Sequence, residues 1–239
     1  MIRIIRSSLF LALFLMGALS LIVQADTGRV TVLEAKGIIN PVLADYIKRG
    51  VEEAEANNST ACIIRMDTPG GLDTAMRDIV QIILDAKVPI VVYVSPSGAR
   101  AASAGVFITL AAHVAAMSTN TAIGAAHPVA IDTSGGEQQM SDEMTQKVLN
   151  DAAAYIRGIA DSRGRNADWA EKAVRESVSI TDSEALQQNV IDLISPTLDD
   201  LLVQLDGRKV TLIDGSQVTL NTRNASLDYQ DMTWMEEFR

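Results

Sequence analysis

Short and long apolar segments alternate along the first half of the chain. Four short runs are rich in β-branched and other apolar residues and predict buried β-strands. They are Val30–Lys36, Ala61–Asp67, Pro89–Ser95 and Val114–Ser118. Longer segments with helical apolar spacing lie between them and predict helices at Pro41–Ala56, Leu72–Ala86 and Ala101–Ala112. Strands that alternate with helices form βαβ units, so the pattern predicts a parallel sheet covered by helices.

The second half of the chain is predicted to be mainly helical. A polar, glycine-containing segment at Asp132–Gln139 predicts a mobile surface loop. Helical spacing then predicts four further helices, at Met144–Ala160, Asn166–Ser177, Asp182–Asn189 and Thr197–Leu205. The apolar stripe of the first of these helices includes Met144, Val148, Tyr155 and Ile159.

The C-terminal segment predicts a small hairpin and a polar tail. Lys209–Ile213 and Gln217–Leu220 flank a glycine-containing turn and predict two paired strands. The tail Tyr229–Phe238 combines aromatic with acidic residues, and its Tyr and Trp suit a membrane–water interface.

The first 25 residues predict a signal peptide. Arg3 and Arg6 precede an apolar core, Leu9–Val23, and small residues follow at a position suited to cleavage. This core has 15 residues, fewer than the roughly 20 needed to span a bilayer comfortably. An uncleaved anchor is the alternative interpretation, and either one predicts an exported domain.

Composition narrows the possible partners. The chain of 239 residues has 20 basic and 30 acidic side chains, a net charge of −10, and loss of Arg3 and Arg6 would make it more negative. Such a surface repels phosphate backbones, so we expect no nucleic-acid partner. The single cysteine, Cys62, lies in a predicted strand, so no internal disulfide is expected. Glycine motifs for nucleotide binding are absent from the sequence, which disfavours a nucleotide cofactor.

Two stretches combine candidate chemistry. In Val91–Gly105, a predicted strand is followed by a Ser-Pro-Ser-Gly loop and a helix that places Ser103 in its first turn among Ala and Gly. A nucleophilic serine needs such exposure, space and nearby N–H donors. Most serines in such helices are packing residues, which is the alternative interpretation. The second stretch, Met66–Gly71, ends in a Pro-Gly-Gly turn that can expose backbone N–H groups toward a neighbouring site.

These motifs together resemble a known family. DTPGG, SPSGARAASAG and TAIGAAHPV, in this order and at this spacing, resemble the ClpP/crotonase superfamily and are most similar to the NfeD-type membrane-bound serine proteases. The resemblance extends from about Val30 to Asp192 and implies an α/β fold, a spiral of ββα units, here with a small C-terminal β-hairpin. We therefore expect a signal peptide at 1–25, a ClpP-like serine protease domain at 26–195, and a C-terminal helix, hairpin and juxtamembrane tail at 196–239.

The resemblance also implies roles for individual residues. Ser103 would be the nucleophile of an endopeptidase that needs no metal or cofactor. The N–H groups of Gly71 and Ala104 would form the oxyanion hole, with Gly70 shaping the turn.

Two residues compete for the role of general base. The resemblance favours Lys147, which lies 44 residues after Ser103 on the predicted helix. A lysine acts as a base only when neutral, which requires burial to lower its pKa from about 10.4. A surface pair between Lys147 and Asp151 is the structural alternative. His127, at nearly the spacing found in ClpP itself, is the alternative base, but it would need an orienting carboxylate. His113 is expected to be structural.

Partner and location follow from the resemblance. It implies a protease on the periplasmic or extracytoplasmic face of a membrane that cleaves apolar segments of a stomatin/prohibitin-like membrane protein, and that self-associates as a homodimer. We expect Ala residues, Val106 and Phe107 to line an apolar cleft beside Ser103. A catalytically inactive scaffold and an acyl-thioester-binding crotonase-like module are the alternative functions.

Overall fold

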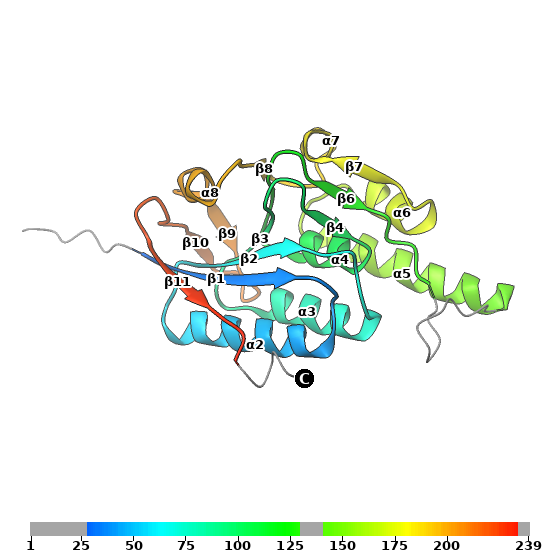
Figure 1. Cartoon of the computed structure of the whole chain (residues 1–239), viewed down its shortest axis with the longest axis horizontal. Coiled ribbons are helices and arrows are strands. Elements are labelled where there is room, and N and C mark those ends of the chain that lie inside the picture. The colour runs from blue at the N-terminus through cyan, green and yellow to red at the C-terminus, as the bar shows by residue number, and fades with distance from the viewer. Residues whose placement is uncertain (1–27, 130–140, 234–239) are drawn as a thin grey trace, which may run out of the picture.

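A parallel sheet forms the centre of the protein (Figure 1). The computed structural model describes residues 28–129 and 141–233. Within them, the main sheet has six parallel strands. In spatial order they are β11 (Ser226–Gln230), β1 (Arg29–Lys36), β2 (Ala61–Asp67), β3 (Ile90–Val94), β5 (Val114–Met117) and β8 (Leu193–Ile194).

Both faces of this sheet are buried, which explains why its strands are continuous apolar runs. Side chains alternate between the faces, so Cys62, Ile64 and Met66 of β2 lie in one apolar cluster. Ala61 and Ile63 of the same strand lie in the other cluster. Burial on two sides therefore fixes the register of β2 with its neighbours.

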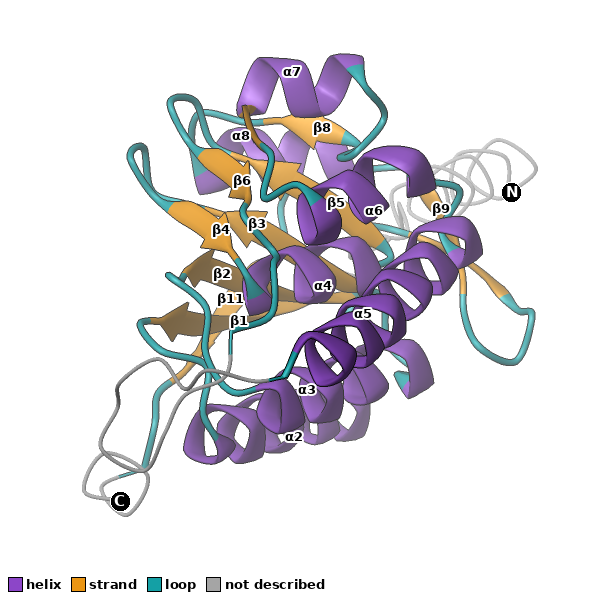
Figure 2. Ribbon diagram, turned by 90° about the vertical axis from the view of Figure 1, so that its right-hand side faces the viewer, coloured by secondary structure: helices purple, strands orange, loops and turns teal. Residues whose placement is uncertain are grey.

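Helices cover one face, and smaller elements cover the other (Figure 2). The first face packs against α2 (Pro41–Ala56), α3 (Asp73–Asp85), α4 (Ala104–Ala111), α5 (Asp142–Ser162) and α6 (Ala167–Arg175). The second face packs against α8 (Leu198–Leu205) and the antiparallel hairpin of β9 (Lys209–Thr211) and β10 (Gln217–Thr219). The predicted hairpin is therefore present.

A second, smaller sheet connects the two halves of the chain. Its order is β4 (Arg100–Ala102), β6 (Ala122–Gly124) and β7 (Ser179–Thr181), and α7 (Asp182–Gln187) follows β7. The Thr181 hydroxyl caps α7, and Glu184 reaches back to the Thr181 N–H in a capping box. This sheet lies next to the end of β2, where Thr68 forms a bridge with Ala101.

Two sequence predictions need correction. The helix predicted at Ala101–Ala112 begins only at Ala104, because Arg100–Ala102 pairs with β6 as a strand. The predicted tail begins at Tyr229, but Tyr229 and Gln230 belong to a strand, β11 (Ser226–Gln230), which pairs with β1 at the edge of the main sheet. The hydroxyl of Tyr46 on α2 donates to the Gln230 carbonyl and holds this strand in place.

Several predictions lie outside the described residues. They are the signal peptide, the whole loop Asp132–Gln139, and the last part of the tail, residues 234–239. Within 28–129 and 141–233, no helix is both long enough and apolar enough to cross a membrane.

Candidate active site

Ser103 occupies a sharp corner between a strand and a helix. It follows β4 directly and precedes α4, with φ 52° and ψ −114°, a conformation that non-glycine residues rarely adopt. Its N–H donates to the Gly124 carbonyl of β6 at 3.1 Å, which holds the corner in place. The sequence placed Ser103 inside the first helical turn, whereas the structure places it immediately before that turn. The corner leaves the serine side chain half-exposed at the helix N-terminus.

Thr68 organises the glycine turn that faces this corner. It is fully buried, and its hydroxyl donates to the Gly37 carbonyl at 2.6 Å while accepting from the Gly70 N–H at 3.0 Å. The first turn of α4 packs so closely here that a Cβ on Gly105 would lie 2.7 Å from Thr68 Cγ2. Thr68 therefore links the turn after β2 to the helix after Ser103. No local sequence pattern indicates this role, because it depends on the backbone of Gly37, 31 residues away, as well as on that of Gly70.

Gly71 lies in a short backbone bridge that fixes the direction of the turn. Ile39 pairs with it in parallel, donating its N–H to the Gly70 carbonyl and accepting from the Leu72 N–H, both at 2.9 Å. A Cβ on Gly71 would lie 2.1 Å from the Ile39 carbonyl oxygen, so only glycine fits.

The turn and the corner leave two N–H groups without acceptors. Among the described residues, neither the Gly71 N–H nor the Ala104 N–H donates a hydrogen bond, whereas the Gly70 N–H is used by Thr68. Gly70 packs against the Ser103 side chain. Free backbone N–H groups on either side of a hydroxyl are the arrangement that stabilises an oxyanion in acyl transfer.

The predicted base Lys147 faces solvent. It lies in the first half of α5 with 67% of its side chain exposed, and its Nζ is 2.7 Å from Glu143 Oε1 one turn earlier. The surface pair of Lys147 with Asp151, which was the alternative to a catalytic role, is not formed, because Lys147 pairs with Glu143 and Asp151 pairs with Arg77. The Ser103 hydroxyl, for its part, makes no hydrogen bond within the described part of the chain.

Asp151 forms an ion pair with Arg77 on α3 instead of with Lys147. The Arg77 guanidinium bonds Asp73 and Asp151 and lies 4.4 Å from the ring centroid of Tyr155. The Tyr155 ring stacks on Phe107 of α4 at 6.0 Å between centroids. These contacts fix the second half of α5 against α3 and α4. Helical spacing alone did not indicate this connection because it joins residues on different helices.

Both histidines make backbone contacts. The Nδ1 of His127 lies 3.0 Å from the Val174 carbonyl at the end of α6, so the ring meets a carbonyl and not the carboxylate that a catalytic histidine would use. His113 accepts the Ile90 N–H at Nδ1. Burial, with Arg163 and Arg165 nearby, lowers the pKa of His113 to about 3, so this ring is neutral.

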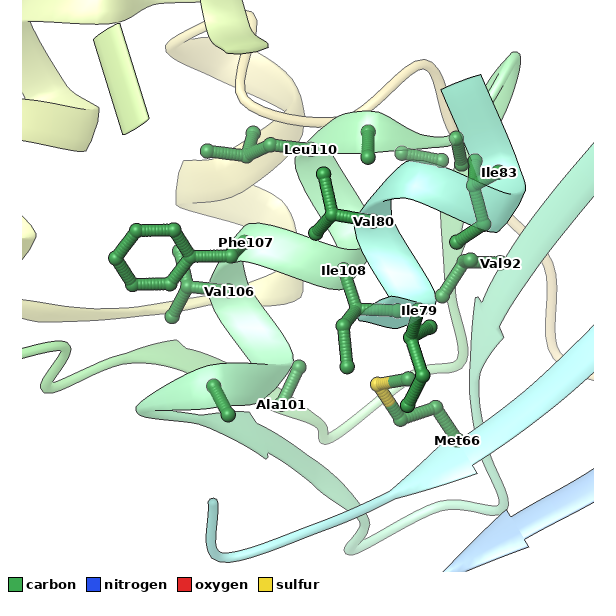
Figure 3. Close-up of a cluster of buried hydrophobic side chains, with 14 of the residues drawn as sticks. Met66, Ile79, Val80, Ile83, Val92, Ala101, Val106, Phe107, Ile108 and Leu110 are labelled. Carbon is green, nitrogen blue, oxygen red and sulfur yellow. The ribbon is translucent and has the colours of Figure 1, made fainter. Parts of the chain in front are cut away.

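The apolar residues beside Ser103 differ from those expected. Val106 and Phe107 are buried in the core cluster and do not line a cleft. In Figure 3 both side chains point away from α3, and Phe107 stacks on Tyr155 of α5. Two other apolar side chains beside the turn are exposed: Leu72, which follows Gly71, at 47%, and Ile38, which precedes the Ile39 that pairs with Gly71, at 64%. In the part of the chain that the structure describes, no three His, Cys, Asp or Glu side chains are grouped to hold a metal ion.

Comparison with solved structures defines the class of protein. ClpP1 from Listeria monocytogenes superposes with a TM-score of 0.56 over 72% of this chain and 94% of that chain, at 22% sequence identity, a likeness of fold alone. The protein is thus an α/β protein with a ClpP-like fold, as predicted. The sequence profile described as NfeD1b, N-terminal domain, matches residues 29–201, and the chain belongs to this family.

Two curated relatives extend the comparison. A membrane-bound protease of Pyrococcus horikoshii is 39% identical over 201 residues, 84% of this chain and 45% of the relative. The membrane protein NfeD1b of Bacillus subtilis is 28% identical over 149 residues, 60% of this chain and 32% of the relative. The chain thus spans less than half the length of either relative.

Solved structures of a membrane-bound stomatin-specific protease are also similar. A variant with a lysine replaced by alanine, in complex with a substrate peptide, has a TM-score of 0.81 at 35% identity, over 89% of this chain and 96% of that one. A variant with a serine replaced by alanine has a TM-score of 0.79 at 36% identity, over 87% of this chain and 99% of that one. The family resemblance found in the sequence is thereby confirmed.

Proposed function

We propose that this protein is an exported, membrane-associated serine endopeptidase with Ser103 as its nucleophile. The observation that carries the proposal is the backbone conformation of Ser103, φ 52° at the start of α4, packed against Gly70 and followed by Ala104. Among the described residues, the N–H groups of Gly71 and Ala104 donate no hydrogen bond. A strained corner with free donors suits a tetrahedral intermediate, whose oxyanion the two N–H groups would accept. Gly70 shapes the turn and leaves space for the hydroxyl.

Lys147 is the base in this proposal. The serine and the lysine replaced in the similar protease are separated by nearly the same number of residues as Ser103 and Lys147, which supports the assignment. The proposal requires Lys147 to leave Glu143, a pair in which both side chains are largely exposed. Such pairs contribute about 0.3–0.5 kcal/mol, so their loss is a small barrier. His127 remains the alternative base and would first have to leave the Val174 carbonyl.

The proposed substrate is an apolar segment of a stomatin/prohibitin-like membrane protein. One similar protease is specific for a stomatin homologue, and that family member supports the choice of substrate. On this chain, Ile38 and Leu72 flank the bridge of Ile39 with Gly71 and expose apolar surface beside the free N–H donors. Burial of each substrate side chain there would contribute up to about 1.5–3 kcal/mol. We place the domain on the extracytoplasmic side of the membrane, as a homodimer.

Peptide hydrolysis tests the proposal. The full chain is incubated with peptides tiled across a stomatin homologue and with a mixed peptide library, and the products are sequenced. We expect cuts within runs of Leu, Val, Ile or Phe that disappear in Ser103→Ala, while Ser97→Ala on the preceding loop keeps its activity. Equal turnover by Ser103→Ala would refute the nucleophile. Cuts concentrated beside Lys, Arg, Asp or Glu would refute the apolar substrate, but they would not contradict the role of Ser103 as the nucleophile.

A second candidate is a ClpP-like scaffold without catalytic activity. The observation that favours it is the position of Lys147, which contacts Glu143 and not Ser103. A scaffold would bind the same apolar segments without cutting them. Binding of intact peptide by both wild type and Ser103→Ala, with no product from either, would support this function over the protease.

A further inference from the structure

A cavity of about 930 Å³ lies at the edge of the sheet opposite Ser103. It is bounded by the end of α3, the second half of α5 and the hairpin strand β9. Figure 2 shows β9 beside the end of α5. His113 and Val114, at the start of β5, form part of its wall. Helix α4 extends from Ser103 to this edge, so the cavity is separate from the candidate active site.

The charges around the cavity are mainly positive. Three cations line it, Arg163, Arg208 and Lys209, and none of them has a carboxylate within ion-pair distance among the described residues. Of the two carboxylates in the lining, Asp192 is paired with the buried Arg165, and Asp85 accepts a hydrogen bond from Gln81. Three cations without an ion pair therefore face one carboxylate without an ion pair among the described residues. An excess of free cations in one concave site is notable in a chain with a net charge of −10. It favours a ligand that carries a negative group.

Arg163 is the cation of this group that contacts the backbone of α4. Its Nε donates to the Ala111 carbonyl at the end of α4, at 2.8 Å, and its other N–H groups donate no hydrogen bond to another residue that the structure describes. Burial, with Arg165 nearby, lowers the pKa of Arg163. An anion in the cavity would relieve this unfavourable environment and would use a guanidinium that is already oriented.

Several apolar residues contribute to the remaining wall. Leu84, Ile159 and Val210 line the cavity, and Ile213 beside them is 63% exposed. Gly158 in α5 also lines it, and a Cβ at this position would meet no atom within 4 Å. The site therefore combines a cationic rim with an apolar surface and open space. The volume falls within the range of about 300–1,000 Å³ that is typical of small-molecule sites.

We propose that this cavity binds a single-chain anionic amphiphile, a long-chain fatty acid. The carboxylate would lie among Arg163, Arg208 and Lys209, and the alkyl chain would lie along Leu84 and Val210. An uncharged apolar ligand would leave the three cations without a partner. A free inorganic anion would make no use of the apolar wall. Relatives of this chain are membrane-bound proteins, and a membrane supplies such amphiphiles locally.

Photo-crosslinking tests the proposal on the full chain in phosphatidylcholine nanodiscs. The probe is a palmitate with a diazirine in its alkyl chain, and modified peptides are mapped by mass spectrometry. We expect crosslinks in 81–85, 154–163 and 208–213, displaced by oleate but not by oleyl alcohol, inorganic phosphate or added phosphatidylglycerol. Crosslinks elsewhere, or equal displacement by any of these three competitors, would overturn the proposal.

Two variants identify the groups responsible. Arg208→Glu combined with Lys209→Glu should lower crosslinking about tenfold through loss of charge-assisted contacts. The control Lys48→Glu with Lys172→Glu has the same change in net charge on other exposed helix positions and should leave crosslinking unchanged. Gly158→Leu should occupy part of the cavity and strongly lower crosslinking. We expect this variant to fold, because leucine favours a helix more than glycine does and a Cβ at this position meets no atom within 4 Å; circular dichroism checks this. The matched control is Gln146→Leu, on the same helix outside the cavity. Undiminished crosslinking in Gly158→Leu would refute the site.

Discussion

Gly70 and Ser103 are packed so closely that no side chain fits on Gly70. A Cβ there would lie 2.6 Å from the Cβ of Ser103 and 3.0 Å from its Oγ. Gly70 also has φ +116°, a conformation that L side chains rarely adopt. The turn after β2 and the corner before α4 therefore fit each other only because residue 70 is glycine.

Gly70→Ala should reduce peptide hydrolysis by Ser103 more than tenfold, because the turn or the serine must move to accommodate the methyl group. We expect a stability loss of about 1–3 kcal/mol from the strained backbone, measured by urea denaturation. Gly37→Ala is the matched control, since it also has positive φ, +97°, but a Cβ there meets nothing within 4 Å. If both variants lose stability equally and both keep full activity, the contact between Gly70 and Ser103 has no catalytic importance.

The identity of the base is decided by two substitutions assayed together. Lys147→Ala should lower kcat by about 10²–10⁴-fold, the contribution typical of a general base, while His127→Ala should have a small effect. Glu143→Gln serves as the control, because it removes only the partner of Lys147 and should leave activity unchanged or raise it. Full activity in Lys147→Ala together with loss in His127→Ala would reverse the assignment.

His113 should make the stability depend on pH. Its pKa is about 3 in the folded protein and 6.5 in the unfolded chain. Between these values the unfolded chain binds more protons, so the stability that is fully present above pH 6.5 decreases as the pH falls toward 3. The slope from this residue is at most about 1.4 kcal/mol per pH unit.

Urea denaturation at several pH values between 7 and 4.5 measures this slope. His113→Asn is the informative variant, because its amide oxygen can still accept the Ile90 N–H but the side chain does not titrate. We expect a shallower pH dependence for this variant. An unchanged slope would mean that His113 does not contribute.

The sequence predicted the longer elements well and the shortest ones poorly. Pro41–Ala56 and Ala61–Asp67 match α2 and β2 because each carries a full apolar period and is buried along its length. The strand β4 has three residues, too few for any period to be visible. The strand β11 is polar, and its pairing with β1 joins opposite ends of the chain. No local pattern contains that information.

The same limit applies to the candidate site. The glycine motifs indicated that a turn and a serine corner would meet, because they reflect backbone geometry. They could not indicate Thr68, whose role depends on hydrogen bonds to Gly37 and Gly70. Nor could they indicate Arg77, which pairs with Asp151 on another helix. Side chains that act between separate elements need the folded structure to reveal them.

Labelling with a fluorophosphonate tests the central claim, an activated Ser103, most directly. The full chain is treated with the reagent, and modified serines are identified by peptide mass spectrometry, with exposed Ser97 as an internal reference. We predict stoichiometric modification of Ser103 with release of fluoride, none at Ser97, and none at either position in Ser103→Ala. Modification of Ser103 no faster than Ser97 would contradict the account, because an oxyanion site that does not accelerate phosphonylation is not catalytic.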